Sequence, residues 1–321
     1  MEPVKSEWLQ RVKDSGRPIV ASVSGGKDST AMAIWLKQQG VEETNPIYWG
    51  YADTGWEHES VYRYIDETLI PYLGENFRRV KSKKYPGGMV DLCTQKGAFP
   101  ARRSRFCTDE LKKKPLRDLI KWVKFKYDIQ PINAVGIRAA ESKARSNMLE
   151  WEMGSVLAAN LCDTWRPLIG ATIEHVTALH RDAGIMPCDL YLRDEHYATR
   201  IGCWPCIMSC KSELKAIAVT DEPRVAKIRE LEEVVAVKAA ERLAKKGETF
   251  ESRGVGKPTF FQAKDGTGQC WPIDRVMEWS KTAWGGKVPA DQQLELFAGE
   301  PSERGCQMWG LCDLGPLGDE S

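Results

Sequence analysis

Six consecutive small and polar residues near the N-terminus have the types and spacing for binding phosphate. They are Ser24, Gly25, Gly26, Lys27, Asp28 and Ser29, and they stand between an apolar β-branched run and a helical pattern. Two glycines at a strand-to-helix junction let the backbone approach a ligand closely. The N-terminus of the helix presents free N–H groups to an anion. The pattern therefore predicts a phosphate cradle.

The side chains of these six residues add to the cradle. Lys27 supplies a positive charge, and the two serines supply hydroxyl donors. Asp28 could cap the helix or place a Mg²⁺ ion that bridges phosphates. The spacing differs from the G-x-x-x-x-G-K-[ST] pattern. A turn capped by Asp28 and Ser29 would explain the glycines alone, but the preceding strand and the enclosed Lys-Asp-Ser favour phosphate binding.

Cysteines give the second chemical signal. The two-residue spacer between Cys203 and Cys206 lets both thiolates face one metal ion or cluster. Such a pair also fits a redox dithiol, half of a zinc site or two buried thiols. Further ligands are available at Cys107, Cys210, Cys306 and Cys312, whereas Cys93, Cys162, Cys188 and Cys270 are expected to pack in apolar surroundings. The spacings of a zinc finger are missing, so we favour an iron–sulfur cluster over zinc.

The elements that must position these residues alternate between strands and helices. Strands are expected at 18–23, from 45 into the turn at 53–55, at 77–80, and from 132 into a turn near 138. Helices are expected at 1–17, from the hexapeptide to about 36, and at 57–73, 109–126, 173–184, 219–246 and 273–284. This alternation predicts an α/β fold with a doubly wound, mostly parallel sheet, whose ligands bind beyond the carboxyl ends of the strands. A cap at Thr108 or Asp109 would leave Cys107 just outside a positive helix end, which favours its thiolate.

Polar residues after the other strands should share that edge of the sheet. Asp53 follows the second strand, and Gly136, Arg138, Glu141 and Arg145 follow the fourth. The lysines at 81, 83 and 84 either face phosphate or form a solvated run, and the basic residues at 102, 103, 105 and 112–114 either contact a nucleic-acid backbone or line a solvated helix face. The histidines at 175 and 180 are five residues apart, on different helix faces, and are expected at the surface or in packing.

Composition limits the alternatives. The 321 residues carry 46 basic and 45 acidic side chains, so no global charge demands a nucleic-acid partner. No run is long and apolar enough for a membrane span, and the N-terminus lacks the apolar run of a signal peptide. We therefore expect a cytoplasmic protein. A nucleotide-binding α/β domain is expected over 1–200, and a smaller helical, cysteine-bearing region over 201–321.

Taken together, the motifs resemble the phosphoadenosine phosphosulfate reductase family of the PP-loop ATP pyrophosphatase superfamily. The resemblance covers roughly residues 15–215. Its motifs are Ser24-Gly-Gly-Lys-Asp-Ser29, Asp53-Thr-Gly55, Cys107-x7-Pro115-Leu116, and Gly136-Ile-Arg138-x2-Glu141-Ser142-x2-Arg145 with the later Cys203-x2-Cys206. In its C-x-x-C the chain also resembles cluster-bearing DNA phosphorothioation enzymes. Family members with a [4Fe-4S] cluster place two adjacent cysteines where this chain has Cys107 and Thr108.

The resemblance implies that the hexapeptide holds the β and γ phosphates of ATP, with Lys27, Asp28 and Arg138 in catalysis. It implies further that Asp53 and Gly136 lie near the nucleotide, and that Arg138 and Arg145 face the α phosphate or an acidic acceptor. Because Thr108 replaces a cysteine, Cys312, or else Cys306 or Cys210, would have to join Cys107, Cys203 and Cys206 as the fourth cluster ligand.

Two departures from the family bear on the reaction. Reductases that take a preformed activated sulfate carry a degenerate loop and a C-terminal Glu-Cys-Gly, whereas this loop is complete and Cys312 follows Gly310-Leu311. We therefore expect an enzyme that cleaves ATP to AMP and pyrophosphate and adenylates an acceptor, for sulfur transfer. The acceptor would be a nucleic acid or a sulfate-type small molecule, with a sulfur-donor protein as a further partner. The alternatives are reduction of phosphoadenylyl or adenylyl sulfate with Cys312 as the attacking thiol, and a nucleotide- or DNA-binding module without turnover.

Overall fold

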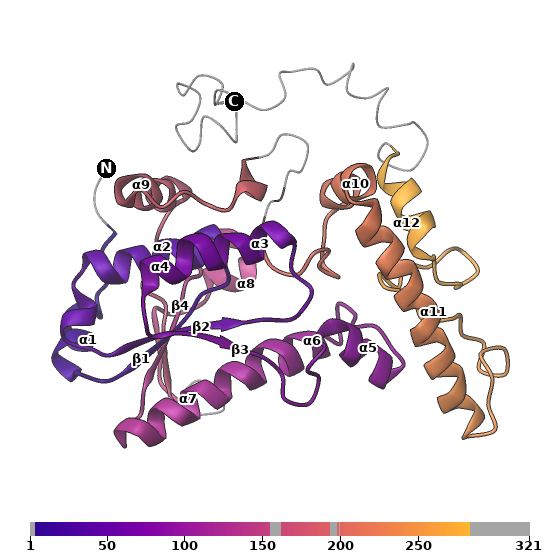
Figure 1. Ribbon diagram of the computed structural model, residues 1–321, viewed down its shortest axis with the longest axis horizontal. Helices are drawn as coiled ribbons and strands as arrows, with labels where there is room; N and C mark the ends of the chain where they lie inside the picture. The colour runs from indigo at the N-terminus through magenta and orange to yellow at the C-terminus, as the bar shows by residue number, and fades with distance from the viewer. Residues whose placement is uncertain (1–3, 155–161, 193–197, 199, 283–321) are drawn as a thin grey trace, which may run out of the picture.

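A six-stranded, mostly parallel sheet is the centre of the computed structural model, which describes residues 4–154, 162–192, 198 and 200–282 (Figure 1). The strands are β1 (Ile19–Ser22), β2 (Ile47–Ala52), β3 (Phe77–Val80), β4 (Ile132–Val135), β5 (Trp151–Glu152) and β6 (Asp163–Trp165). Their order is β3-β2-β1-β4-β6-β5, and only the edge strand β5 runs antiparallel to its neighbour. The predicted α/β class is confirmed.

Helices cover both faces of this sheet, as the alternation of elements predicts. The α-helices are α1 (Leu9–Ser15), α2 (Lys27–Gln38), α3 (Glu59–Tyr64), α4 (Ile70–Leu73), α5 (Met89–Lys96), α6 (Phe106–Thr108), α7 (Lys114–Tyr127), α8 (Lys143–Ser146), α9 (Ile173–Ala183), α10 (Lys211–Thr220), α11 (Glu222–Ala244) and α12 (Ile273–Ser280). Figure 1 shows α2, α3, α4 and α9 on one face and α7 on the other. Strand β1 serves both layers, because Ile19 and Ala21 pack with the α2 side and Val20 with α7.

The strand order places a topological switch point between β1 and β4. From β1 the chain moves outward to β2 and β3, and it then returns to the other side of β1 as β4. The carboxyl ends of β1 and β4 therefore open into a crevice that their connections leave uncovered. The hexapeptide follows β1, and Gly136 and Arg138 follow β4, so both motifs lie at this crevice.

Several expected helix boundaries are wrong. The first helix starts at Leu9 rather than at the N-terminus. The helix expected over 219–246 is α11, which starts only at Glu222, because Val219 and Thr220 end the separate helix α10. The break is at Asp221, whose carboxylate accepts a hydrogen bond from the backbone N–H of Arg224 (3.1 Å) and so caps α11. Pro223 lies in the first turn of α11, as expected, because its missing N–H is not needed there.

The helix expected from Asp109 starts earlier, at α6, and reaches α7 through a π-helical turn over Asp109–Lys113. Pro115 follows directly after this turn, at the start of α7. A π turn shifts the backbone hydrogen-bond register, so the chain passes the proline without a separate break. Because the helix starts at Phe106, Cys107 lies inside its first turn and not outside the helix end.

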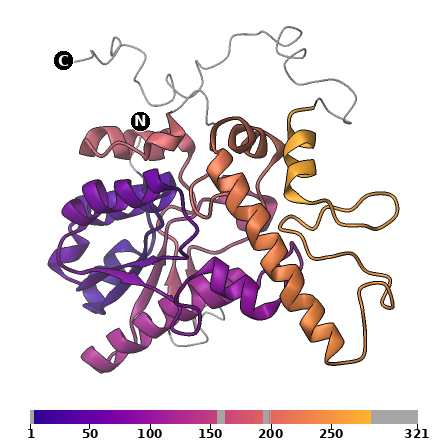
Figure 2. The ribbon, with the colours of Figure 1, turned by 45° about the vertical axis from the view of Figure 1, so that its right-hand side comes forward.

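The C-terminal helices α10, α11 and α12 pack beside the α/β part, and Figure 2 shows α11 alongside α5. The segment 249–268 is rich in glycine, lysine and polar residues, a composition that predicts a linker or mobile loop, yet it contributes a core residue. Phe260 is fully buried, with its ring centroid 5.7 Å from that of Trp56 and 5.5 Å from that of Phe99. The carboxylate of Glu232 on α11 accepts the backbone N–H groups of Phe260 (2.8 Å) and Ile273 (3.0 Å). The boundary at 200/201 stays a prediction.

Within the described part of the chain, none of the helices combines the length and apolar character that crossing a membrane requires.

Candidate functional site

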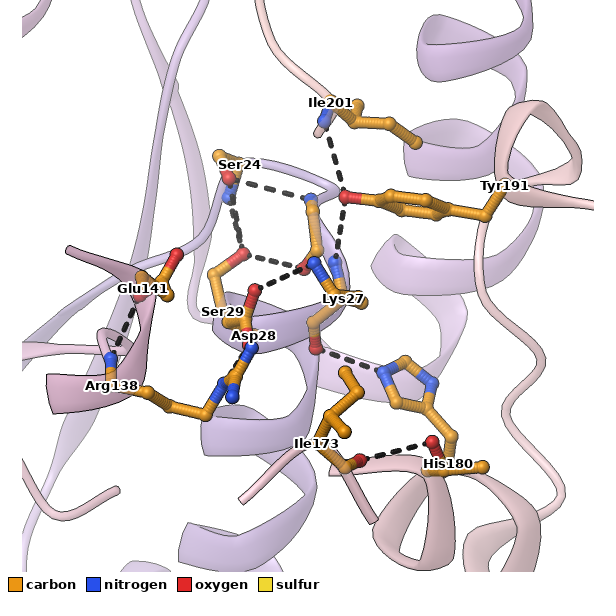
Figure 3. A network of polar contacts seen from close by, with 12 residues as sticks. Ser24, Lys27, Asp28, Ser29, Arg138, Glu141, Ile173, His180, Tyr191 and Ile201 are labelled. Carbon is orange, nitrogen blue, oxygen red and sulfur yellow. Dashed lines mark hydrogen bonds and ion pairs between the residues drawn. The ribbon is translucent and has the colours of Figure 1, made fainter. Parts of the chain in front are cut away.

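The hexapeptide forms a closed turn between β1 and α2 (Figure 3). Gly25 has φ +75°, a left-handed conformation that favours glycine. The hydroxyl of Ser29 donates to the carbonyl of Gly26 (2.9 Å) and accepts the backbone N–H of Ser24 (3.1 Å), while the hydroxyl of Ser24 accepts the N–H of Gly26 (3.3 Å). Both serine hydroxyls therefore hold the turn in shape, a role the sequence pattern did not suggest.

Gly136 lets the connection after β4 press against this turn. A Cβ atom at Gly136 would lie 2.6 Å from the carbonyl oxygen of Asp28 and 2.7 Å from the Cα of Ser29. Backbone atoms cannot yield at such distances, so only glycine fits. The predicted site residue Gly136 thus brings the β1 and β4 connections into direct contact.

The carboxylate of Asp28 lies between two cations. Its Oδ1 accepts a hydrogen bond from Nε of Arg138 (2.5 Å), and its Oδ2 lies 3.2 Å from Nζ of Lys27. All three side chains are largely buried. The three residues expected in catalysis are therefore assembled as one ionic cluster, and two positive charges meet one negative charge beside the turn (Figure 3).

This arrangement does not fit Asp28 as a magnesium ligand. Each of its oxygens already faces a cation. Asp28 instead orients Lys27 and Arg138.

Two residues that sequence reasoning missed hold the turn from outside. The hydroxyl of Tyr191 accepts the backbone N–H groups of Lys27 (3.4 Å) and Ile201 (3.1 Å). Burial raises the pKa of Tyr191, which keeps this hydroxyl neutral. Nε2 of His180 lies 2.9 Å from the carbonyl oxygen of Lys27, and burial lowers the pKa of His180. No local motif marks either residue, because both reach the turn from far along the chain.

Asp53 is separate from the ionic cluster. Its carboxylate is 3% exposed, lies 3.1 Å from Nζ of Lys81, and accepts the hydroxyl of Tyr62 (3.1 Å) and the backbone N–H of Gly55 (2.9 Å). Lys81 was expected either to face phosphate or to lie in a solvated run, and the structure shows instead that it forms an ion pair with Asp53. Asp53 lies at the carboxyl end of β2, as expected, but does not line the main cavity.

The main cavity has a volume of about 310 Å³ and lies between the turn and the chain segment around residue 200. Predicted residues lining it are Ser24, Gly26, Asp28, Ser29, Gly136, Arg145, Cys203 and Cys206. Arg145 forms an ion pair with Glu141, which also lines the cavity. Two further cations lie in its walls: Lys112, expected either to contact a nucleic-acid backbone or to lie on a solvated helix face, and Arg200, which was not predicted as a ligand-binding residue. Three positive side chains, those of Lys112, Arg145 and Arg200, and three carboxylates, those of Asp28, Glu141 and Glu213, line this cavity beside the Ser24–Ser29 turn. The ammonium and guanidinium groups can each bind a phosphate oxygen.

Three of the predicted cluster ligands meet at a neighbouring cavity of about 90 Å³. Cys107, Cys203 and Cys206 line it together with Lys112. Burial raises the pKa of the Cys107 thiol to about 11, which corrects the expected thiolate. The expectation was wrong because Cys107 lies within the helix and is shielded from water. Burial also raises the pKa of Cys203, and the ammonium group of Lys112 opposes that rise.

The donor chemistry of this cavity fits a thiolate-bound cluster. Arg105, Lys112 and Arg200 line it with the three thiols, so an anionic cluster would meet compensating charge. Of the suggested fourth ligands, Cys210 is exposed at the start of α10, outside this cavity, while Cys306 and Cys312 lie outside the described residues. Among the described residues, the three thiols do not by themselves form a complete site for a single metal ion.

Comparison with known proteins identifies relatives. The phosphoadenosine phosphosulfate reductase domain family matches residues 18–209. The uncharacterized 37.8 kDa protein in the gpa 5′ region of Escherichia phage 186 is 33% identical over 259 residues, which are 68% of this chain and 75% of that protein.

Solved structures give weaker similarities. The phosphoadenylyl-sulfate reductase of Candida auris, in a phosphate complex, has a TM-score of 0.46 and 15% identity over 62% of this chain and 89% of its own. The U34-tRNA thiolase NcsA of Methanococcus maripaludis, with its [4Fe-4S] cluster, has a TM-score of 0.36 and 16% identity, and the match covers 74% of this chain and 80% of that protein. Likenesses at these TM-scores carry no information on function. The family match spans more than half of the sequence, and the chain therefore belongs to the phosphoadenosine phosphosulfate reductase domain family.

Proposed function

We propose that this protein is an ATP pyrophosphatase that transfers the adenylyl group of ATP to an oxygen atom of an acceptor. The observation that carries the proposal is the complete Ser24–Ser29 turn, of which Ser24, Gly26, Asp28 and Ser29 line a cavity of about 310 Å³ whose other walls hold Lys112, Arg145 and Arg200. A helix N-terminus and three cations at one cavity suit a triphosphate.

In the proposed reaction an acceptor oxygen attacks the α phosphorus of ATP. The bond from that phosphorus to the α–β bridging oxygen breaks, and pyrophosphate leaves with the developing negative charge. Donors that are already in place stabilise this charge without reorganising. The turn and Lys27 would hold the β and γ phosphates, and Arg138 and Arg145 would hold the α phosphate.

Adenylation would turn the acceptor oxygen into a leaving group that sulfur can displace. The resemblance to DNA phosphorothioation enzymes implies this use of the adenylated acceptor. Cys107, Cys203 and Cys206, with Cys312 as the fourth ligand, would hold a [4Fe-4S] cluster. Bound there, the cluster would supply iron-bound sulfur chemistry beside the nucleotide cavity. A sulfur-donor protein would be a further partner.

The test is a product assay with ATP labelled at the α phosphate. We expect AMP-containing product and pyrophosphate, without ADP. Lys27→Ala should lower turnover about 100-fold or more, the usual effect of removing one charge-stabilising donor. Lys245→Ala, at an exposed position on the far end of α11, should leave turnover unchanged. ADP and phosphate as products, or ATP binding without turnover with any acceptor, would refute the proposal.

Membership of the family favours one second candidate, its namesake reduction. In that reaction the thiolate of Cys312 would attack the sulfur atom of phosphoadenylyl sulfate, form an S–S bond and displace adenosine 3′,5′-bisphosphate. A dithiol would then release sulfite from the Cys312 sulfur and be oxidised to a disulfide. Incubation with phosphoadenylyl sulfate and a dithiol separates the two functions. Sulfite formation that Cys312→Ser abolishes would establish the reductase and displace the adenylyl transfer.

A further inference from the structure

A further, basic cavity lies beside α7. It is separate from the main cavity, which is the one proposed for the nucleotide, and from the smaller cavity lined by cysteines. It has a volume of about 330 Å³ and is formed between the loop after β3 and the exposed side of α7. The cations that line it are Lys81, Lys83, Lys84, Lys114, Arg117 and Lys121, and its acidic lining residues are Glu110 and Asp118. We call this cavity the basic groove. Positive charge exceeds negative charge in it by four, since six cations face two carboxylates.

The ion pairs of the basic groove leave several cations without a counterion. Lys114 pairs with Glu110 (2.7 Å), Lys81 with Asp53 outside the groove (3.1 Å), and Lys83 lies 3.8 Å from Asp118. Lys84, Arg117 and Lys121 remain without an ion pair among the described residues. Within the residues that the structure describes, Arg117 has neither a hydrogen bond nor an ion pair, and its Nε is buried without an acceptor. A buried guanidinium nitrogen without an acceptor is costly unless a ligand supplies negative charge near it.

The exposed face of α7 extends the basic groove along the helix. Lys114, Arg117, Lys121 and Lys124 follow each other at intervals of three and four residues, which places them on one face. From Lys114 to Lys124 this row spans about 15 Å at a rise of 1.5 Å per residue. That length equals roughly four nucleotide steps at about 3.4 Å per step.

An exposed aromatic ring lies beside the C-terminal end of the basic row. Phe125 is 88% exposed and follows Lys121 by one helical turn, and the neighbouring Trp122 is 43% exposed. Aromatic side chains next to a row of cations are typical of surfaces that bind single strands, where bases stack while phosphates meet the cations. Paired bases in a duplex are not available for such stacking.

We propose that the basic groove and the row on α7 bind the backbone of a single-stranded nucleic acid, with Phe125 as a stacking platform. The arginines at 102 and 103, considered from the sequence, lie outside the groove. Lys112, two residues before Lys114, lines the main cavity, so the basic groove and the main cavity adjoin the same continuous helical element. That the strand is also the acceptor rests on the proposed function, whereas its binding does not.

Binding is tested without ATP, by fluorescence anisotropy of a labelled oligothymidylate of about 20 nucleotides at several salt concentrations. The double variant Lys121→Glu/Lys124→Glu should bind at least tenfold more weakly, and the slope of log affinity against log salt should fall by about 1.4, or about 0.7 for each lost phosphate contact. Phe125→Ala should weaken binding about tenfold.

The matched control is Lys245→Glu/Lys246→Glu, which makes the same charge change at two exposed positions beyond α11 and should bind as the wild type does. Equal affinity of the two double variants, or no binding by the wild type, would overturn the proposal. Tighter binding of duplex, or equal binding of polyglutamate, would overturn the assignment to a single-stranded nucleic acid. Pyrophosphate release from ATP, measured in parallel, reports on the proposed function separately.

Discussion

At the scale of single residues, the site is organised by charge compensation around Asp28. The sequence indicates a lysine and an aspartate in the turn, and an arginine after a later strand. It does not indicate that the carboxylate lies between the two cations, 2.5 Å from Nε of Arg138 and 3.2 Å from Nζ of Lys27. A carboxylate in this position fixes the directions of both cations before a phosphate arrives, so less reorganisation is needed on binding.

Asp28→Asn should therefore lower the free energy of unfolding by about 3 kcal/mol, because it leaves two largely buried cations side by side without their counterion. Urea denaturation measures this change. Asp109→Asn, which breaks an exposed pair with Lys113 (2.9 Å), should cost less than about 1 kcal/mol. Equal losses in the two variants would contradict the buried cluster.

The thiol of Cys107 gives a pH-dependent prediction. Its pKa rises from 9.0 to about 11 through burial, and only the thiolate reacts with iodoacetamide. In chelator-treated protein, alkylation at Cys107 should keep increasing about tenfold per pH unit beyond pH 9. Peptide mass spectrometry at each pH follows the site, and circular dichroism confirms that the protein stays folded. A rate that levels off near pH 8 would restore the low pKa expected from a helix end.

At the scale of elements, two local backbone features determine which helices and loops lie next to each other. Gly136 allows the β4 connection to touch the start of α2. The π turn before α7 carries the chain past Pro115 without ending the helix, which keeps Cys107 and the basic face of α7 on one continuous element. These two local features position the nucleotide cavity, the cysteine cavity and the basic groove relative to the sheet.

Gly136→Ala should lower the free energy of unfolding by about 1–3 kcal/mol and weaken ATP binding, because the added methyl group must displace the backbone of Asp28 and Ser29. Thermal unfolding and calorimetric titration with ATP measure the two effects. The control Gly170→Ala meets no atom within 4 Å and should change stability by less than about 0.5 kcal/mol. A wild-type affinity in Gly136→Ala would contradict the proposed contact.

The sequence predicted those elements whose signals are local. Apolar, β-branched runs that alternate with helical patterns located β1 to β4, and glycine signals located the turn and the end of α9 at Gly184. Features that depend on distant partners were not predictable. Tyr191 contacts Lys27 from 164 residues away, and His180 from 153. The boundary between α10 and α11 was missed because a helical pattern continues through Asp221.

At the scale of the whole molecule, the C-terminal helices are joined to the α/β part by a buried aromatic contact. Phe260 packs against Trp56 and Phe99, while Glu232 accepts two backbone N–H groups from the segment that carries Phe260. Trp56 in turn donates its indole N–H to the carbonyl of Pro205 (3.2 Å), next to Cys206. The C-terminal helices thus help to hold the cysteine segment in place.

Phe260→Ala should lower the free energy of unfolding by about 3–5 kcal/mol, because it empties a fully buried aromatic site. Phe125→Ala makes the same substitution at a position that is 88% exposed and should change stability by less than about 0.5 kcal/mol. Guanidinium denaturation of both variants provides the comparison. A small loss in Phe260→Ala would show that the segment 249–268 is a linker after all.

The hydroxyl of Tyr191 joins the backbone of Lys27 to that of Ile201. During synthesis on the ribosome, the turn at Lys27 leaves the exit tunnel long before either partner has been translated. The nascent chain therefore cannot complete its nucleotide cavity while it is being made, and a protein cut short before Ile201 would have the whole motif but no finished cavity. A shortened gene product of this kind would keep the family's sequence motifs but would lack the proposed adenylyl transfer.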